Sequence, residues 1–300
     1  MILKAVRNNK IESFFIVLGF IVIVALVIYF VCYYMDLGPY SVVIAMAFSI
    51  ISSFITYYNC DKLVLAMNNA RPANSQEDQL LTSVMDGLVI ASGLPRPKLY
   101  VVDDPSPNAF ATGRNPEHAV ICVTTGLLQI MDKYELEGVL AHELSHVKNY
   151  DILLSTVVSV FAGFIVMVSD FIFRFGFRGR RSSSNDEGDF AKYKIILYIV
   201  GLIFLILSPI VAKIIQLAVS RKREYLADAT SVEFTRNPKG LISALRKLDS
   251  DTSSMSHISK ATAHMYINDP SSKTRRIASS SLFATHPPIA ERIERLENIN

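Results

Sequence analysis

Two long stretches without a charged side chain dominate the first 60 residues of this 300-residue chain. Residues 13–35 form a run of 23, and residues 37–60 form a run of 24, with only Asp36 between them. A transmembrane helix needs about 20 predominantly apolar residues, so each run is long enough to cross a bilayer. The composition agrees, because only 19% of the residues are charged, against about 25% in soluble domains. We therefore predict that residues 1–60 form a transmembrane helical hairpin.

The basic residues before the first run allow a second interpretation and also set the orientation. Lys4, Arg7 and Lys10 resemble the start of a cleaved signal peptide, but the apolar run is too long and no small-x-small cleavage site follows it. The connection at Asp36 carries no Lys or Arg. Basic residues are retained on the cytoplasmic side of a membrane. We therefore interpret the first run as a signal anchor. The N-terminus and the segment after the hairpin, residues 61–151, are predicted to face the cytoplasm.

Two shorter apolar runs, residues 152–169 and 195–212, predict a second hairpin within residues 152–219. Each run has 18 residues, which is at the lower limit for a span. Residues 171–194, between the runs, contain six basic residues against three acidic ones. Such a bias is unusual for a loop on the outer side of the membrane. The hairpin therefore either spans the membrane or inserts only partly, and we favour the spanning form.

The soluble part consists of two separate segments, residues 61–151 and 220–300. Residues 76–92 have the apolar spacing of a helix that ends at Gly93. Residues 98–102, 108–112 and 119–124 are bounded by Pro and Gly and read as three short strands. The chain after Val219 is polar and mostly helical. The predicted fold class is mainly α with a small β-sheet, attached to a membrane part of four helices in two hairpins.

The sequence His142-Glu143-Leu144-Ser145-His146 is an HExxH motif inside a segment with a helical pattern, residues 134–147. Positions i and i+4 share one face of a helix, so the two imidazoles can bind one zinc ion. Glu143 is suited to act as a general base on a water molecule. Because the motif is short, a surface helix with two solvated histidines is the alternative. The helical setting and a suitable third ligand favour the zinc site.

A catalytic zinc ion usually takes three protein ligands and a water molecule. The downstream candidates are His257, His264, His286 and several acids, and the best of them is Glu224. If residues 152–219 form an antiparallel hairpin, its midpoint lies near residue 185, and His146 and Glu224 are each about 39 residues from it. His146 and Glu224 then lie at the same distance from the membrane, just beyond its surface on one side. The alternative is that Glu224 is an exposed helix charge that pairs with a neighbouring Arg.

Asp228 follows Glu224 by four residues and lies on the same helix face. Histidines that bind zinc usually donate their other ring N–H to a carboxylate or a carbonyl. We therefore predict that Asp228 accepts this hydrogen bond from His142. The alternative is an ordinary surface aspartate.

Taken together, these residues resemble a gluzincin metallopeptidase, and more narrowly the HtpX family of membrane zinc proteases, relatives of the CAAX prenyl endopeptidases. The segments that carry the resemblance are residues 108–113, 124–128, 140–146, 220–228, 285–288 and 292–293. The resemblance covers nearly the whole chain. It implies a zincin-like catalytic domain with one Zn²⁺ per chain, held by His142, His146 and Glu224, with Glu143 as the catalytic base.

The resemblance also implies a location and a substrate class. Members of this family are endopeptidases of the bacterial inner membrane that act at the cytoplasmic face on damaged or misassembled membrane proteins. The partners expected from it are membrane-protein or peptide substrates and the lipid bilayer. A net charge of +3 is too weak to indicate a nucleic-acid partner. The sequence leaves the oligomeric state open.

Two further hypotheses concern substrate and transition state. The developing oxyanion needs a hydrogen-bond donor, and the resemblance places His286, in the sequence Thr-His-Pro-Pro, near the site. The alternative for His286 is a helix boundary, since Pro287 and Pro288 suit the start of a helix. An extended substrate could add to an exposed strand edge, formed either by residues 108–112 or by residues 119–124. The alternative is that both strands are simply core.

The remaining histidines and cysteines receive simpler interpretations. His257 and His264 lie in or near a Ser-rich stretch and are expected to be solvated. Cys60 and Cys122 are expected to be small buried apolar side chains that fill space.

Two other functions compete with proteolysis. A non-enzymatic membrane scaffold or chaperone would be expected to lack a zinc ligand or the catalytic base, and none of these residues is missing here. A small transporter would be expected to carry ionisable residues in mid-span, and the first two runs carry none.

Overall fold

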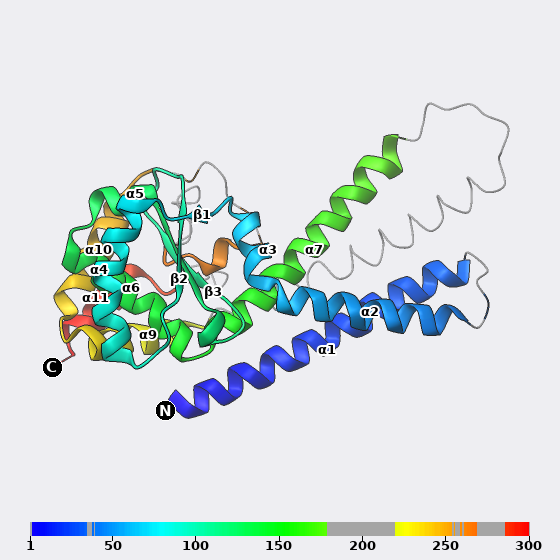
Figure 1. Ribbon diagram of the computed structural model, residues 1–300, viewed down its shortest axis with the longest axis horizontal. Coiled ribbons are helices and arrows are strands. Elements are labelled where there is room, and N and C mark those ends of the chain that lie inside the picture. Colours follow the sequence, from blue (N-terminus) through cyan, green and yellow to red (C-terminus); the bar gives the residue numbers. More distant parts are fainter. Residues whose placement is uncertain are drawn as a thin grey trace.

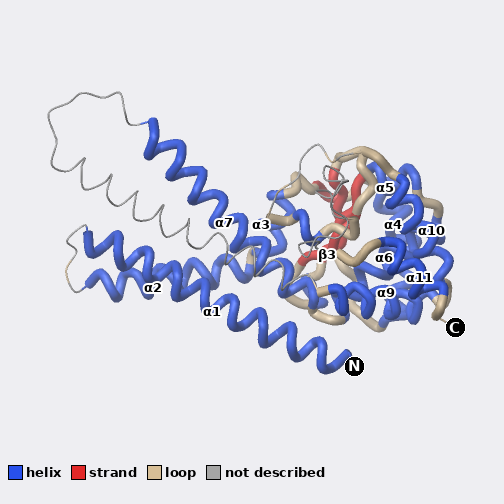
Figure 2. The backbone as a smooth tube through the Cα atoms, turned by 180° about the vertical axis from the view of Figure 1, so that it is seen from behind, coloured by secondary structure: helices blue, strands red, loops and turns tan. Residues whose placement is uncertain are grey.

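The computed structural model describes residues 2–34, 38, 40–178, 220–253, 255, 259, 261–268 and 286–299. The first two apolar runs form long helices, α1 (Ile2–Tyr34) and α2 (Tyr40–Tyr58). The helix α2 and the C-terminal half of α1 lie side by side and project away from the part of the chain that contains the sheet (Figures 1 and 2). Ser49 on α2 donates a hydrogen bond to the Ile21 carbonyl of α1 at 2.7 Å. The predicted N-terminal hairpin is therefore present as two packed helices.

The outer surfaces of α1 and α2 are apolar. Large hydrophobic side chains are exposed along both helices, among them Phe14, Phe15, Val22, Phe48 and Phe54. By length and composition, Leu3–Tyr29 is the one single helix among the described residues that could cross a membrane, with two bent helix pairs as further candidates. Exposed apolar surface on this scale is stable against lipid rather than water. The first helix therefore fits a membrane anchor.

The two bent pairs have different surroundings. One joins α2 to α3 (Cys60–Met67) at 71°, and the other joins α6 (Lys133–Lys148) to α7 (Asp151–Arg178) at 84°. Most residues of α6 are buried among other protein elements, so only α7 of the second pair can face lipid. It packs against α1, where the rings of Phe20 and Phe161 stack with centroids 3.9 Å apart. The returning half of the second predicted hairpin, residues 195–212, lies outside the described residues.

A small mixed sheet forms the centre of the remaining part. Its strands are β1 (Arg71–Pro72), β2 (Lys98–Val102), β3 (Ala109–Thr112) and β4 (Val120–Thr124). Their order is β1-β2-β4-β3, with β2 and β4 parallel and the other pairs antiparallel. The sequence predicted three strands and missed β1, because two residues that include a proline give no alternating pattern. Residues 119–124 were a candidate edge, but β4 is an inner strand and β3 lies at the edge.

Helices cover the sheet and complete what we call the sheet domain, which is built from the sheet and the helices other than α1, α2 and α7. Besides α3 and α6 these are α4 (Ser75–Ser92), α5 (Thr125–Ile130), α9 (Arg221–Thr235), α10 (Pro238–Ser250) and α11 (Ile289–Glu297). The inner faces of α4, α5, α6, α9, α10 and α11 share one hydrophobic core with strands β2 to β4, whereas α3 packs in a second cluster with Phe110 and Cys122. Cys60 and Cys122 are buried free thiols, as predicted. The fold is mainly α with a small sheet.

Two glycines allow α6 and α10 to cross in close contact. A Cβ atom added at Gly138 of α6 would lie 2.6 Å from the backbone nitrogen of Leu241, and one added at Gly240 of α10 would lie 2.5 Å from the Tyr134 carbonyl oxygen. Real side chains do not reach such distances without backbone movement. Gly138 therefore interrupts the helical pattern of the HExxH segment because the neighbouring helix occupies the space of a side chain.

We expect Gly138→Ala to lower the free energy of unfolding by about 1–3 kcal/mol, because the added methyl group overpacks the contact between α6 and α10. Chemical denaturation of the detergent-solubilised protein, followed by circular dichroism, measures this loss. The matched control is Gly87→Ala in α4, where an added Cβ meets no atom within 4 Å. That change should be neutral or stabilising, by about 0.5–1 kcal/mol. Equal effects of the two substitutions would contradict the close-contact explanation.

Candidate metal centre and active site

The HExxH sequence lies in the largely buried C-terminal half of α6. The helix begins at a capping box, in which Asp132 Oδ1 accepts from the Glu135 amide at 2.9 Å and Glu135 Oε2 accepts from the Asp132 amide at 2.8 Å. Glu135 is held in turn by Lys247 of α10 at 2.6 Å. These contacts fix the start of α6 and hence the direction in which His142 and His146 project, four residues apart on one face.

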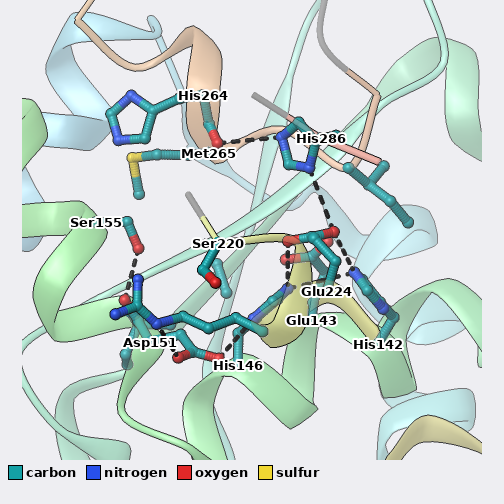
Figure 3. A pocket seen from close by; sticks show the side chains of 14 residues that line it. His142, Glu143, His146, Asp151, Ser155, Ser220, Glu224, His264, Met265 and His286 are labelled. Atoms are coloured by element: carbon teal, nitrogen blue, oxygen red, sulfur yellow. Dashed lines mark hydrogen bonds and ion pairs between the residues drawn. The ribbon is translucent and has the colours of Figure 1, made fainter. Parts of the chain in front are cut away.

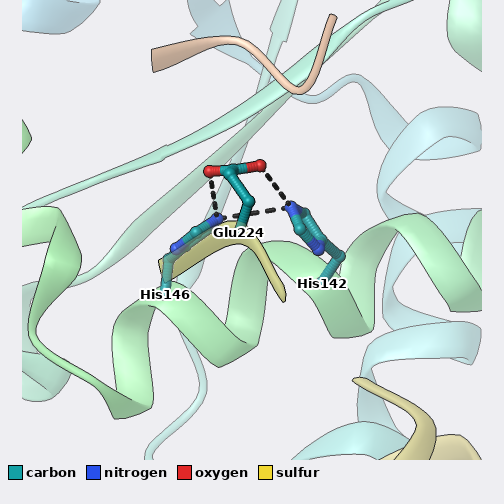
Figure 4. A group of neighbouring side chains, drawn as sticks. All are labelled: His142, His146 and Glu224. Carbon is teal, nitrogen blue, oxygen red and sulfur yellow. Dashed lines mark hydrogen bonds and ion pairs between the residues drawn. The ribbon is translucent and has the colours of Figure 1, made fainter. Parts of the chain in front are cut away.

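Glu224, on the first turn of α9, completes a candidate metal-binding group with His142 and His146 (Figure 4). Its carboxylate oxygens lie 3.7 Å from His142 Nε2 and 3.6 Å from His146 Nε2, and the two Nε2 atoms are 3.3 Å apart. A tetrahedral zinc ion with bonds of about 2.0–2.1 Å to nitrogen holds its ligand atoms about 3.3 Å apart. The spacing and the two-imidazole, one-carboxylate donor set therefore fit a catalytic zinc site.

The negative charge of Glu224 also favours the binding of a cation. The residue is buried, and Glu224 Oε2 has no hydrogen-bond partner within the part of the chain that the structure describes. Burial acts to raise the pKa of Glu224, but the histidines around it outweigh burial and hold this pKa well below its usual range. The carboxylate is therefore ionised and keeps a lone pair directed into the site, as a metal ligand requires.

Each of the two imidazoles is oriented by a carboxylate. His142 Nδ1 lies 3.0 Å from Asp228 Oδ1, and His146 Nδ1 lies 3.0 Å from Asp151 Oδ2. Donation from Nδ1 leaves each Nε2 with a free lone pair toward Glu224. The sequence predicted the contact of Asp228 but missed that of Asp151. Asp151 follows His146 by five residues, and the turn at Tyr150, with φ 59°, brings it back to the imidazole.

A buried arginine completes the network behind His142. Arg292 of α11 is fully buried and binds Asp228 through two nitrogens, Nη2 at 2.7 Å and Nε at 3.0 Å. Burial acts to raise the pKa of Asp228, but Arg292 and His142 hold it below its usual range. A sequence signal for this position exists, because Arg292 occupies the buried face of an amphipathic helix with Leu296 one turn later.

Glu143 lies in the same pocket as the metal-binding group, as the close view in Figure 3 shows. Only 2% of the residue is exposed. Burial raises the pKa of Glu143, although the neighbouring His142 and His146 oppose this shift. A carboxylate whose pKa is raised toward neutrality is a better proton acceptor at that pH. Its position and its environment both suit a general base.

His286 also lies in this pocket, next to Glu224. Its Nδ1 is 3.3 Å from Glu224 Oε2, and its Nε2 is 3.2 Å from the His264 carbonyl oxygen. His264 was expected to be solvated, and this prediction is wrong, because the residue is only 4% exposed. The segment that contains it folds against α7, where His264 Nε2 lies 3.5 Å from Ser159 Oγ. His257 lies outside the described residues.

The match to known families decides the class of protein. A model of Peptidase family M48 matches residues 75–300, which include all of the residues placed in this site. The chain belongs to peptidase family M48. M48 proteins are metalloproteases, and the buried group of two histidines and one glutamate is a candidate for the metal site of such a protein. With the apolar helix α1, the M48 chain is a membrane metalloprotease.

Full-length relatives agree with this assignment. A protein of Thermoanaerobacter pseudethanolicus named Protease HtpX homolog is 43% identical to this chain over 296 residues, which cover 97% of this chain and 96% of the relative. A protein of Streptococcus gordonii with the same name is 40% identical over 300 residues, which cover 100% of both chains. A crystal structure of Ste24p from S. mikatae has a TM-score of 0.50 at 22% identity, covering 98% of this chain and 67% of that chain. This likeness supports the fold of the M48 chain.

Proposed function

We propose that this M48 protein is a zinc-dependent endopeptidase of the bacterial inner membrane that cleaves misfolded or damaged membrane proteins at the cytoplasmic face. The observation that carries the proposal is the donor set of His142, His146 and Glu224, whose atoms lie within 4.8 Å of one another. The competing role, a scaffold or chaperone that keeps the fold without activity, is less well supported. It gives no reason for an intact ligand set beside a buried Glu143.

The roles of the residues follow from their contacts. His142, His146 and Glu224 would hold one zinc ion, which when bound polarises a carbonyl and lowers the pKa of water to about 7. Glu143 accepts the proton of the attacking water and returns it to the leaving amine. His286 is the proposed donor to the developing oxyanion. Asp228 and Asp151 keep His142 and His146 in the tautomer that can bind a metal.

The edge strand β3 supplies a place for an extended substrate. In the antiparallel pair with β4, Ala109 and Ala111 direct their backbone groups away from β4. The Ala109 carbonyl accepts from Ile267 at 2.9 Å and its amide lies 3.1 Å from Asn108 Oδ1, whereas Ala111 lines the active-site pocket. Backbone pairing at Ala111 would position a peptide with little dependence on its side chains. This suits substrates that are damaged proteins.

Removal of the metal tests the proposal directly. We expect Glu224→Ala to lose stoichiometric zinc, because a catalytic site depends on all three protein ligands, and to lose cleavage of an unfolded protein substrate. Treatment of the unmodified protein with 1,10-phenanthroline should abolish cleavage, and added zinc should restore it. The non-chelating isomer 1,7-phenanthroline is the control. Full activity of a protein shown to be free of metal would rule out the proposed chemistry.

The cytoplasmic orientation needs a separate experiment. Ser83 is an exposed position on α4, in the sheet domain. We expect Ser83→Cys in intact bacterial spheroplasts to resist a membrane-impermeant maleimide and to react only after the membrane is permeabilised. The native Cys60 and Cys122 are buried, and Cys32 is replaced by serine in both the variant and its parent, so that the background is low. Labelling of Ser83→Cys before permeabilisation would place the sheet domain on the opposite side.

A further inference from the structure

The N-terminal end of α1 reaches into the sheet domain, beside the metal centre. Asn9 lies one turn before the apolar run begins and is only 1% exposed. Its side-chain nitrogen donates to Asp151 Oδ1 at 2.5 Å and to the Asn149 carbonyl at 2.9 Å. Asp151 Oδ2 is the atom that orients His146. The first membrane helix is therefore separated from a metal-binding imidazole by a single carboxylate.

A second contact from the same helix reaches the third ligand. Glu12, three residues after Asn9, pairs with Arg223 Nη2 at 2.6 Å. Arg223 directly precedes Glu224, and its Nε lies 3.6 Å from Asp151 Oδ1. Contacts on α1 thus extend to the chain on both sides of the metal site, at the start of α7 and at the start of α9.

We propose that α1 is a structural part of the metal centre and that Asn9 is a positioning residue that acts on His146 through Asp151. The reason is geometric. A carboxylate can rotate, and a donor fixed on Oδ1 leaves only Oδ2 for the imidazole. The alternative is that Asn9 merely anchors α1 to the sheet domain, in which case its loss would change stability without changing metal binding. This inference rests on the proposed function only for the identity of the metal.

The test compares two neighbouring asparagines of α1. Asn9→Leu removes the donor, and Asn8→Leu is the matched control because Asn8 is exposed. Zinc affinity is measured in detergent by competition with a chromophoric chelator, and we expect about 10- to 100-fold weaker binding for Asn9→Leu alone. Asn9→Ser serves the same purpose if the leucine variant does not fold. Unchanged affinity in a folded Asn9 variant overturns the inference.

A double-mutant cycle distinguishes positioning from anchoring. If Asn9 acts through Asp151, then Asp151→Asn and the double variant with Asn9→Leu should bind zinc almost equally weakly, since the second change has nothing left to disturb. Independent, additive losses would show that Asn9 acts by another route. If the unmodified protein binds no zinc, the proposed function fails. If it binds zinc and Asn9→Leu matches Asn8→Leu, only the present inference fails.

A cavity of about 460 Å³ lies beside α1, bounded also by α2, by the start of α7 and by the loop that contains Arg114. It contains two cationic side chains, Lys10 and Arg114, and two tyrosines, Tyr57 and Tyr150. Lys10 Nζ lies 4.0 Å from the centre of the Tyr150 ring. Among the described residues, no carboxylate lies within the 4.0 Å of an ion pair from either cation. The cavity therefore offers positive charge without an acidic partner.

The cavity lies where the membrane boundary is expected. Lys10 precedes the apolar run that begins at Ser13, and Tyr57 is near the end of the second run. Phe14, Val17 and Leu153 form the apolar part of the wall. Lys and Tyr side chains at this level meet lipid headgroups. We infer that the cavity binds one anionic phospholipid, with its phosphate at Lys10 and Arg114 and its acyl chains along the apolar wall.

Native mass spectrometry tests this assignment on protein purified from vesicles of phosphatidylethanolamine with phosphatidylglycerol. We expect the unmodified protein to retain phosphatidylglycerol in preference, and Lys10→Gln/Arg114→Gln to bind it about 30-fold more weakly. Lys239→Gln, at an exposed position of α10, is the control. Inorganic phosphate should not displace the lipid, because it lacks acyl chains. Equal retention of both lipids, displacement by phosphate, or unchanged retention by the double variant each overturns the assignment.

Discussion

We expect the Glu143→Gln variant to lose peptidase activity while it keeps its zinc. Glu143 lies beside His142 on α6 but is not one of the three residues whose donor atoms cluster together. The amide has nearly the same shape as the carboxylate and cannot accept a proton, so kcat should fall by about 10²- to 10⁴-fold. Zinc content by atomic absorption and cleavage of an unfolded protein substrate are measured on the same preparation.

The control for this variant is Glu137→Gln, on the same helix and only partly buried. It removes the same charge from α6 without touching the pocket, and it should leave kcat and zinc content unchanged. Near-normal cleavage by zinc-loaded Glu143→Gln would assign the proton transfer to another group. Loss of zinc from that variant would instead mean that Glu143 shapes the metal centre.

We expect Arg292→Met to lower the free energy of unfolding by about 3–5 kcal/mol. Methionine replaces the volume of Arg292 but leaves Asp228 ionised and buried without its cationic partner, and breaking a buried pair in this way has a cost of that size. Arg292→Lys should restore only part of the loss, because an ammonium group cannot bind both oxygens of Asp228 in the geometry of Arg292. Chemical denaturation followed by circular dichroism gives the values.

Arg295→Met is the matched control on the same helix. The Arg295 side chain is 56% exposed and pairs with Glu291 on the surface, so its loss should cost less than about 1 kcal/mol. The double variant Asp228→Asn/Arg292→Met removes both charges and should recover part of the stability lost in the single variant. A small and equal effect of Arg292→Met and Arg295→Met would show that the buried pair contributes little.

The elements that the sequence predicted well have strong local signals. The apolar runs before and after Asp36 gave α1 and α2 through length alone, and the helical pattern of residues 134–147 agrees with α6. Strands of four or five residues were found from their β-branched residues and their Pro and Gly boundaries. The prediction that Glu224 joins His142 and His146 needed one long-range argument. The structure brings these three residues together, and their role as zinc ligands stays a proposal.

The features that the sequence did not predict depend on tertiary contacts. Nothing near Asp151 in the sequence indicates that the left-handed turn at Tyr150 returns it to His146. His264 was misjudged because a Ser-rich neighbourhood usually lies in solvent, whereas the chain there folds onto α7. Asn9 belongs to a helix that the sequence defines only as a membrane anchor. In each case the partner is supplied by an element that is distant in sequence or lies beyond a turn.

The unbroken helix α1 fixes the distance between the candidate metal centre and the apolar, membrane-facing part of the chain. The helix runs without a break from Asn9, which contacts the carboxylate behind His146, to the exposed Phe14. At about 1.5 Å per residue, these two positions differ by about 7.5 Å along the axis. An extended polypeptide covers that span with two or three residues, at about 3.3 Å each. On the proposed function, peptide bonds immediately adjoining a transmembrane segment of a substrate are within reach of Glu143, and substrate selection can depend on proximity to the bilayer instead of on a consensus sequence.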